Sequence, residues 1–182
     1  MAAIDKIYVT DEVSQHIFVG SWQASTDYDS LAEDNIKVIF SLEINAKPKY
    51  ITDIYDEYKI LSYEIHVDNV QGEDLQIWFP RIYAILDYYT RHDTNVLVHC
   101  GDGYSRAIVA VAAFLLMKAY VNSPDHKVNI KKQITDDVLK HVISKRKHAS
   151  PSLNFVSQLR VFENMIRSGE FDIYQLKQQP KK

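Results

Sequence analysis

The sequence predicts an α/β fold in which helices flank a central sheet, and three observations indicate it. Short apolar runs typical of buried strands stand at residues 37–42 and 96–99. Segments with apolar residues at helical spacing follow, and the longest, residues 106–120, is apolar on nearly every side. The chain has 182 residues, the length of a single domain, so the strands and helices belong to one layered unit.

The strands are predicted mainly in the first hundred residues. Residues 7–10 and 16–20 predict a short strand pair. Residues 37–42 predict the next strand, and the alternating apolar residues of 60–67 predict another. The run 96–99 is short and wholly apolar up to its histidine, which is typical of a strand buried on both faces.

Two helices are predicted among these strands. Thr26 or Asp27 is expected to cap a short one. A second helix over residues 75–89 follows the capping residue Asp74. Pro80 lies inside its pattern and predicts either a kink or a late start.

Helices are predicted to fill the rest of the chain. The helix over residues 106–120 is expected at the centre, and helices over 135–147 and 152–168 each present one apolar face. Residues 1–170 are predicted to form one domain, and residues 171–182 a polar C-terminal tail.

Composition excludes some classes of partner and environment. The net charge of −3 favours neither nucleic acid nor an anionic membrane as a partner. The Lys/Arg clusters near 127–132 and 145–148 are interpreted as solvated faces. One cysteine allows no internal disulfide, and the longest apolar stretch, 107–117, is too short to cross a bilayer. We therefore expect an intracellular, reducing location, the cytoplasm, without excluding the nucleus.

One segment carries a chemical signal. It lies between a predicted buried strand and a predicted buried helix, and it reads Val98-His99-Cys100-Gly101-Asp102-Gly103-Tyr104-Ser105-Arg106. Two glycines allow the loop to curl so that its backbone N–H groups form a concave nest for an anion. The following helix directs its positive N-terminal end at the nest, and Arg106 offers a planar fork for two phosphate oxygens.

A cysteine at the floor of such a nest has its thiolate stabilised by the amides, the helix dipole and the guanidinium. The alternative interpretation is that Cys100 is a buried structural thiol, as a lone cysteine often is. The combination of strand, glycines, arginine six residues after the cysteine, and apolar helix favours the nucleophile.

The pattern His99-Cys100-x5-Arg106 resembles the signature loop of the protein tyrosine phosphatase superfamily, specifically the small dual-specificity phosphatases. Residues 13–21, 36–42 and 150–159 resemble further segments of that domain, so the likeness covers about residues 7–167. Low-molecular-weight phosphatases and arsenate reductases also use a Cys-x5-Arg loop, but theirs lies near the N-terminus. The position of the loop here, after about a hundred residues, favours the resemblance to dual-specificity phosphatases.

The resemblance implies a central mixed sheet flanked by helices, and a two-step reaction without metal or cofactor. The Cys100 thiolate attacks phosphorus, and water then hydrolyses the cysteinyl-phosphate. The backbone amides of six residues and the Arg106 side chain are expected to bind the phosphate: Gly101, Asp102, Gly103, Tyr104, Ser105 and Arg106. His99 is expected to orient the loop and tune the thiol.

Three residues depart from the family's pattern, and one of them is Ser152, which replaces the family's Asn after Ser-Pro. Asn69 stands where the general acid is expected, so Asp68, one residue earlier, is the candidate acid; Glu73 and Asp74 are further candidates. Ala107 stands where the family usually has Ser or Thr directly after the arginine, and we expect slower hydrolysis of the intermediate.

The leading hypothesis for function is a protein phosphatase acting on phosphotyrosine and phosphoserine or phosphothreonine. The negative charge of Asp102 argues against inositol lipids as substrates. A phosphate-binding pseudophosphatase with little turnover and an enzyme resembling RNA 5′-triphosphatases are the alternatives. The residues before Ile7 are too few to form a long N-terminal helix that could exchange between subunits, which favours a monomer.

Overall fold

A five-stranded sheet lies at the centre of the computed structural model, which describes residues 5–8, 16–43, 49–122, 133–146, 148–173 and 176. The strand order is β1-β2-β5-β3-β4. The four strands from β2 to β4 run parallel, and β1 pairs antiparallel with β2, so the predicted mixed sheet is confirmed. The strands are β1 (Asp5–Tyr8), β2 (His16–Ser21), β3 (Ile36–Ser41), β4 (Leu61–Glu64) and β5 (Asn95–Cys100).

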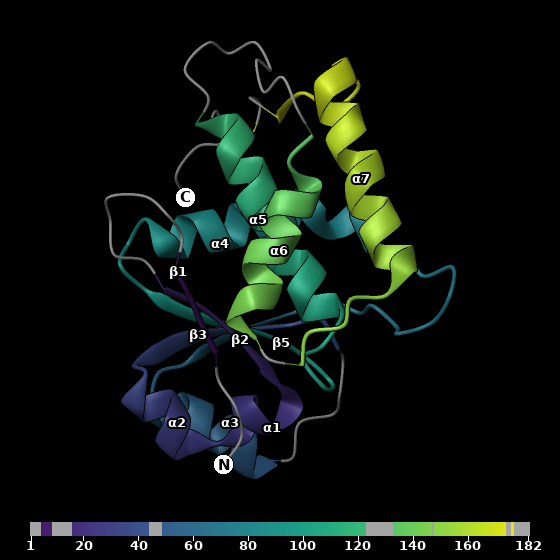
Figure 1. The fold of residues 1–182 in the computed structure, drawn as a ribbon. Coiled ribbons are helices and arrows are strands. Elements are labelled where there is room, and N and C mark those ends of the chain that lie inside the picture. Colours follow the sequence, from purple (N-terminus) through teal and green to yellow (C-terminus); the bar gives the residue numbers. More distant parts are fainter. Residues whose placement is uncertain are drawn as a thin grey trace.

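Helices cover both faces of the sheet (Figure 1). One face carries α1 (Trp22–Thr26), α2 (Tyr28–Glu33) and α3 (Lys49–Glu57). The other carries α4 (Phe79–Thr90), α5 (Arg106–Val121), α6 (Thr135–Lys145) and α7 (Leu153–Ser168). A single 3₁₀ turn, η1 (Gln76–Trp78), precedes α4.

The central strand β5 is apolar because both of its faces are buried. Val96 and Val98 belong to the large core under α4 to α7, whereas Leu97 belongs to the smaller core under α2 and α3. Alternating residues of a strand point to opposite faces, so a strand covered on both sides needs a continuous apolar run.

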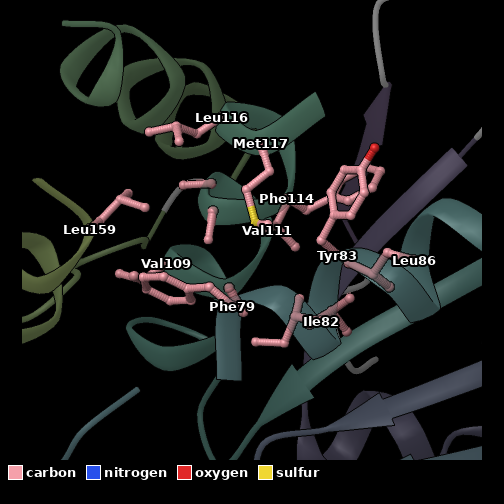
Figure 2. Packing of buried hydrophobic residues seen from close by; sticks show 14 of the residues in the cluster. Phe79, Ile82, Tyr83, Leu86, Val109, Val111, Phe114, Leu116, Met117 and Leu159 are labelled. Atoms are coloured by element: carbon pink, nitrogen blue, oxygen red, sulfur yellow. The ribbon is translucent and has the colours of Figure 1, made fainter. Parts of the chain in front are cut away.

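Helix α5 is the central helix of the larger layer, as predicted. Its residues from Arg106 to Phe114 are all buried. Figure 2 shows how its side chains meet α4: Phe79, Ile82, Tyr83 and Leu86 lie around Val109, Val111, Phe114 and Met117. Because α5 starts six residues after the end of β5, this packing fixes Arg106 at the carboxyl end of the sheet.

Most predicted elements are confirmed, with small shifts of their ends. The helix predicted over 75–89 starts late, since Pro80 occupies the first turn of α4. Asp27 caps α2 through a bond from Ser30 N. Helices α1 and α3 were not predicted: α1 has five residues, and α3 buries only Ile51 and Tyr55.

The packed core continues past the boundary predicted at residue 170. Ile173 is 1% exposed and lies in the larger core. Phe171 packs on Phe162 of α7, with ring centroids 4.9 Å apart. The rest of the predicted tail, apart from Leu176, lies outside the described residues. Within the described part of the chain, none of the helices has the length and apolar character to span a membrane.

Glu163 of α7 joins three helices through a buried carboxylate. Its Oε1 accepts bonds from the Tyr120 hydroxyl (2.6 Å) and Ile134 N (2.7 Å). Its Oε2 accepts from Thr135 N (3.0 Å) and Thr135 Oγ1 (2.6 Å), so it caps α6 from outside. Burial, reinforced by the bond to Glu163, raises the pKa of Tyr120 to about 12, and the hydroxyl therefore remains a donor at neutral pH.

Replacing Glu163 with alanine is expected to lower the free energy of unfolding by about 3 kcal/mol, because several buried donors lose their acceptor. Urea denaturation measures this loss. Glu170→Ala, at an exposed position just beyond α7, is the control and should change stability by less than about 0.5 kcal/mol. Equal effects of the two substitutions would show that the buried carboxylate contributes nothing specific.

Candidate active site

The segment with the chemical signal connects β5 to α5. Cys100 ends β5 and is completely buried, and Arg106 begins α5 at 7% exposure. The parallel neighbours β2 and β3 lie on either side of β5, with Gly20 and Ser41 opposite His99. Residues 101–105 therefore form a loop beyond the carboxyl end of the sheet, where α/β folds place their ligands.

The carbonyl groups of this loop are held from outside. Trp22 N donates to Gly101 O (2.9 Å), and Ser150 N donates to Tyr104 O (2.9 Å). Arg146 Nε donates to Gly103 O (2.8 Å). In a trans peptide the N–H points away from the C=O, so the N–H groups of residues 102, 104 and 105 face the opposite, concave side. The loop is thus built as an anion nest.

Arg146 is the main outer support of the loop. Besides Gly103 O, its guanidinium reaches Asp102 O and Val19 O, each at 3.4 Å, and its Cζ lies 5.7 Å from the centre of the Tyr104 ring. It is only 5% exposed. The interpretation of residues 145–148 as a solvated face is therefore wrong for Arg146. The cluster at 127–132 lies outside the described residues.

Gly103 has to be glycine for two reasons. Its φ of +73° lies in the left-handed region. A Cβ there would also stand 2.3 Å from Gly20 O and 2.8 Å from Arg146 Nη2. Any side chain at this position would push the loop away from both β2 and its support.

The guanidinium of Arg106 is positioned by two oxygen atoms. Its Nη1 donates to Val67 O (2.8 Å), and its Nη2 lies 3.5 Å from Glu43 Oε2. Among the residues that the structure describes, the buried Nε has no hydrogen-bond partner. Nη2 lies 3.3 Å from where a Cβ of Gly101 would stand, so the guanidinium lies against the loop. Nε is thus available to an anion, and Nη2 beside it could share a second oxygen if it turned from Glu43.

His99 and Asp102 both contact Cys100, His99 at its backbone carbonyl and Asp102 at its thiol. His99 is completely buried, and its Nδ1 lies 3.4 Å from Cys100 O. Asp102 Oδ1 accepts the Tyr104 N–H (3.1 Å) and lies 3.9 Å from Cys100 Sγ. Because that N–H faces the concave side, the Asp102 carboxylate lies on the side of the loop that is expected to receive phosphate.

The candidate acids lie on the segment that follows β4. Asp68 follows directly after the Val67 carbonyl that holds Arg106, and its Oδ1 pairs with His66 Nε2 at 3.3 Å, both side chains being more than half exposed. Asp74 Oδ1 accepts Gln76 N, a role at the start of a helical turn. The carbonyl of Glu73 accepts from Asn154 and Gln158 of α7.

Sequence reasoning missed the outer support of the loop. Trp22 and Ser150 act through backbone N–H groups, which every residue but proline has, so their identities carry no signal. Ser152 N donates to Ser105 Oγ (2.9 Å) and is another such case. Arg146 lies in a run of basic residues, and such a run alone does not reveal which member is buried.

Comparison with known proteins agrees with this geometry. Residues 17–165 match the family model described as dual specificity phosphatase, catalytic domain. Dual specificity protein phosphatase 1B of Arabidopsis thaliana is 30% identical over 158 residues, which cover 87% of this chain and 84% of that protein. Dual specificity protein phosphatase 1 of the same plant is 27% identical over 158 residues, covering 87% of this chain and 71% of that protein.

A solved structure has the same fold. The crystal structure of the Yvh1 phosphatase domain from Chaetomium thermophilum superposes with a TM-score of 0.72 at 24% identity, covering 93% of this chain and 99% of that one. The match to the family model spans most of the chain, including the strand, loop and helix described above. The chain therefore belongs to the family of dual specificity phosphatase catalytic domains.

Proposed function

We propose that this protein removes phosphate from phosphotyrosine and from phosphoserine or phosphothreonine in other proteins, with Cys100 as the nucleophile. Membership of the family supports a dual-specificity protein phosphatase. The observation that carries the assignment of residues is the loop 101–105, whose carbonyls are held outside so that its N–H groups face one side. The single cysteine supports work in a reducing compartment such as the cytoplasm.

In the first step the Cys100 thiolate attacks phosphorus, a sulfur–phosphorus bond forms, and the bond to the ester oxygen breaks. The loop N–H groups and the Arg106 guanidinium hold the other phosphate oxygens while charge moves between them. His99, buried beside Cys100, maintains the orientation of the loop. The leaving oxygen takes a proton from a carboxylic acid, and Asp68 supplies it.

Asp68 has to exchange its partner to do this. Its carboxylate is paired with His66 on an exposed surface, whereas its backbone stands beside the Val67 carbonyl that binds Arg106. The proposal requires the carboxyl to leave His66 and turn toward the nest, on a backbone whose preceding carbonyl is bonded to Arg106. The side chain of Asn69 is an amide, which does not release a proton near neutral pH and cannot act as the general acid.

In the second step water attacks the cysteinyl-phosphate, the carboxylate of Asp68 takes the proton from the water, and Cys100 leaves as thiolate. Ala107 brings no hydroxyl to the first turn of α5, so the departing thiolate lacks one hydrogen-bond donor. We expect this step to limit turnover.

A phosphate-binding protein with little turnover is the second candidate. Three observations favour it: the amide at Asn69, the methyl group at Ala107, and the Asp102 carboxylate on the concave side of the loop. Each of them slows chemistry or weakens phosphate binding, and none removes the nest.

Hydrolysis of aryl phosphates tests the enzyme directly. Cys100→Ser is expected to be inactive. Asp68→Ala should lose about 10²-fold or more with a poor leaving group and little with a good one, because only the poor leaving group needs the proton. Asn69→Ala is the matched control and should keep wild-type activity with both substrates. If wild type is as inert as Cys100→Ser and still binds orthovanadate, the phosphate-binding protein is the correct reading.

Replacing Arg146 with lysine keeps the charge but loses the fork that holds several carbonyls at once. We expect the inhibition constant of orthovanadate to rise about tenfold, because the loop amides lose their common orientation. Lys145→Ala, at the exposed neighbouring position, is the control. If part of the variant is unfolded, the apparent kcat falls, but the vanadate affinity of the folded enzyme does not change. An unchanged vanadate affinity would therefore show that Arg146 only stabilises the fold and does not orient the loop amides.

Asp102→Asn keeps the acceptor for Tyr104 N–H and removes the charge beside the thiol. Orthovanadate is expected to bind about fivefold more tightly at low ionic strength, which corresponds to a repulsion of about 1 kcal/mol between charges about 4 Å apart in water. The gain should shrink as salt is added. Asp53→Asn on α3 changes the net charge equally and should have no effect. Equal affinity in both variants would show that the Asp102 carboxylate does not compete with the anion.

A further inference from the structure

A pocket of about 600 Å³ opens between the segment after β4 and the first turn of α7. This volume is in the range that binds small ligands or a few groups of a larger one. Its wall combines amides, a hydroxyl and apolar side chains, and the residues that define it include Asn69, Val70, Gln71, Ser152, Leu153 and Asn154.

The walls of the pocket are fastened to the phosphate loop and to each other. Ser152 N donates to Ser105 Oγ (2.9 Å), which joins the α7 wall to the loop. Asn154 Nδ2 donates to Glu73 O (3.2 Å), and Gln158 Nε2 donates to the same oxygen (2.6 Å), which joins α7 to the other wall. Asn69 in that wall directly follows the candidate acid Asp68. The pocket therefore lies between the segment that carries the candidate acid and the start of α7, which is bonded to the loop.

The chemistry of the lining is neutral. Among the residues that the structure describes, no Lys, Arg or His lines the pocket. The two buried arginines nearby are already engaged, Arg106 at the nest and Arg146 on backbone carbonyls. Glu43 is paired with Arg106 (3.5 Å), and the Asp102 carboxylate lies 3.9 Å from the Cys100 thiol. Among the described lining residues, a second anion next to the phosphate would find no cation to pair with.

The lining also offers apolar contact and amide groups. Leu153 is 85% exposed and Val70 is 58% exposed, so both side chains have apolar surface to cover. Asn69 and Gln71 each carry a donor and an acceptor, which suits the peptide groups of an extended chain.

We propose that this pocket binds the residue next to the phosphorylated one in a protein substrate, and that it selects an uncharged, apolar side chain there. The protein is thereby a phosphatase of singly phosphorylated sites with neutral neighbours. Sites with a second phosphate or a Glu beside the phosphoresidue are poor substrates. This proposal rests on the proposed function, because it concerns the substrate of the same site.

Three phosphotyrosine peptides test it, identical except that both residues beside the phosphotyrosine are Leu, Glu or phosphoserine. Conversion of the phosphotyrosine to tyrosine by the full chain, monitored by tyrosine fluorescence, gives kcat/KM for each. We expect kcat/KM for the Leu peptide to be about tenfold higher than for the Glu peptide. Its advantage over the phosphoserine peptide should be larger still. Leu153→Lys places a cation in the pocket wall and is expected to bring the ratio of Leu to Glu peptide close to one. Val161→Lys is the matched control, eight residues later on α7 and 51% exposed, and should keep the wild-type ratio.

The outcomes separate the two proposals. If neither the peptides nor a small aryl phosphate is hydrolysed, the proposed function fails. If the aryl phosphate and all three peptides are hydrolysed at similar rates, or if Leu153→Lys behaves like Val161→Lys, the enzyme stands and the pocket has no role in selection. A wild-type preference for the Glu or phosphoserine peptide overturns the inference directly.

Discussion

The site depends on one constraint: the peptide planes of residues 101–105 have to turn their carbonyls outward. Three separate segments hold them there: Trp22 after β2, Arg146 at the end of α6, and Ser150 before α7. Each bond removes a carbonyl dipole from the concave side and fixes an N–H on it. Donors held in place before the reaction do not have to reorganise when charge develops, which is the main electrostatic means of stabilising a transition state.

The same loop brings opposite charges close together. Arg146 supports it from outside and Arg106 covers it from α5, whereas Glu43 and Asp102 set carboxylates against it. In the proposed site the Arg106 guanidinium attracts a phosphate, and the Asp102 carboxylate opposes further negative charge beside it. Affinity for an anion and selection among anions are thus properties of different residues around one nest.

The sequence predicts those parts of the structure that depend on local pattern. Strand β5 and helix α5 are visible as apolar runs, and the glycines and arginine between them identify the loop. Each of these features depends on residues that are close together in the chain, so it appears in the sequence as a pattern with fixed spacing. Helix α3 leaves almost none, since it buries only Ile51 and Tyr55. The burial of Arg146 depends on carbonyls of residues 19, 102 and 103, which are distant in the chain, and no local pattern encodes it. The pairing of Asp68 with His66 depends on side-chain rotamers, which the residue order does not specify.

The outer support of the loop has a consequence for the order of events during synthesis. Cys100 and Arg106 leave the ribosome long before Arg146, Ser150 and Ser152, and domains fold as units once enough of the chain is available. Until those last residues dock, the carbonyls of Gly103 and Tyr104 lack their partners and the loop has no fixed shape. A nascent chain that already contains Cys100, the proposed nucleophile, therefore still lacks the ordered loop, and the proposed phosphate site forms only when nearly the whole domain has been made.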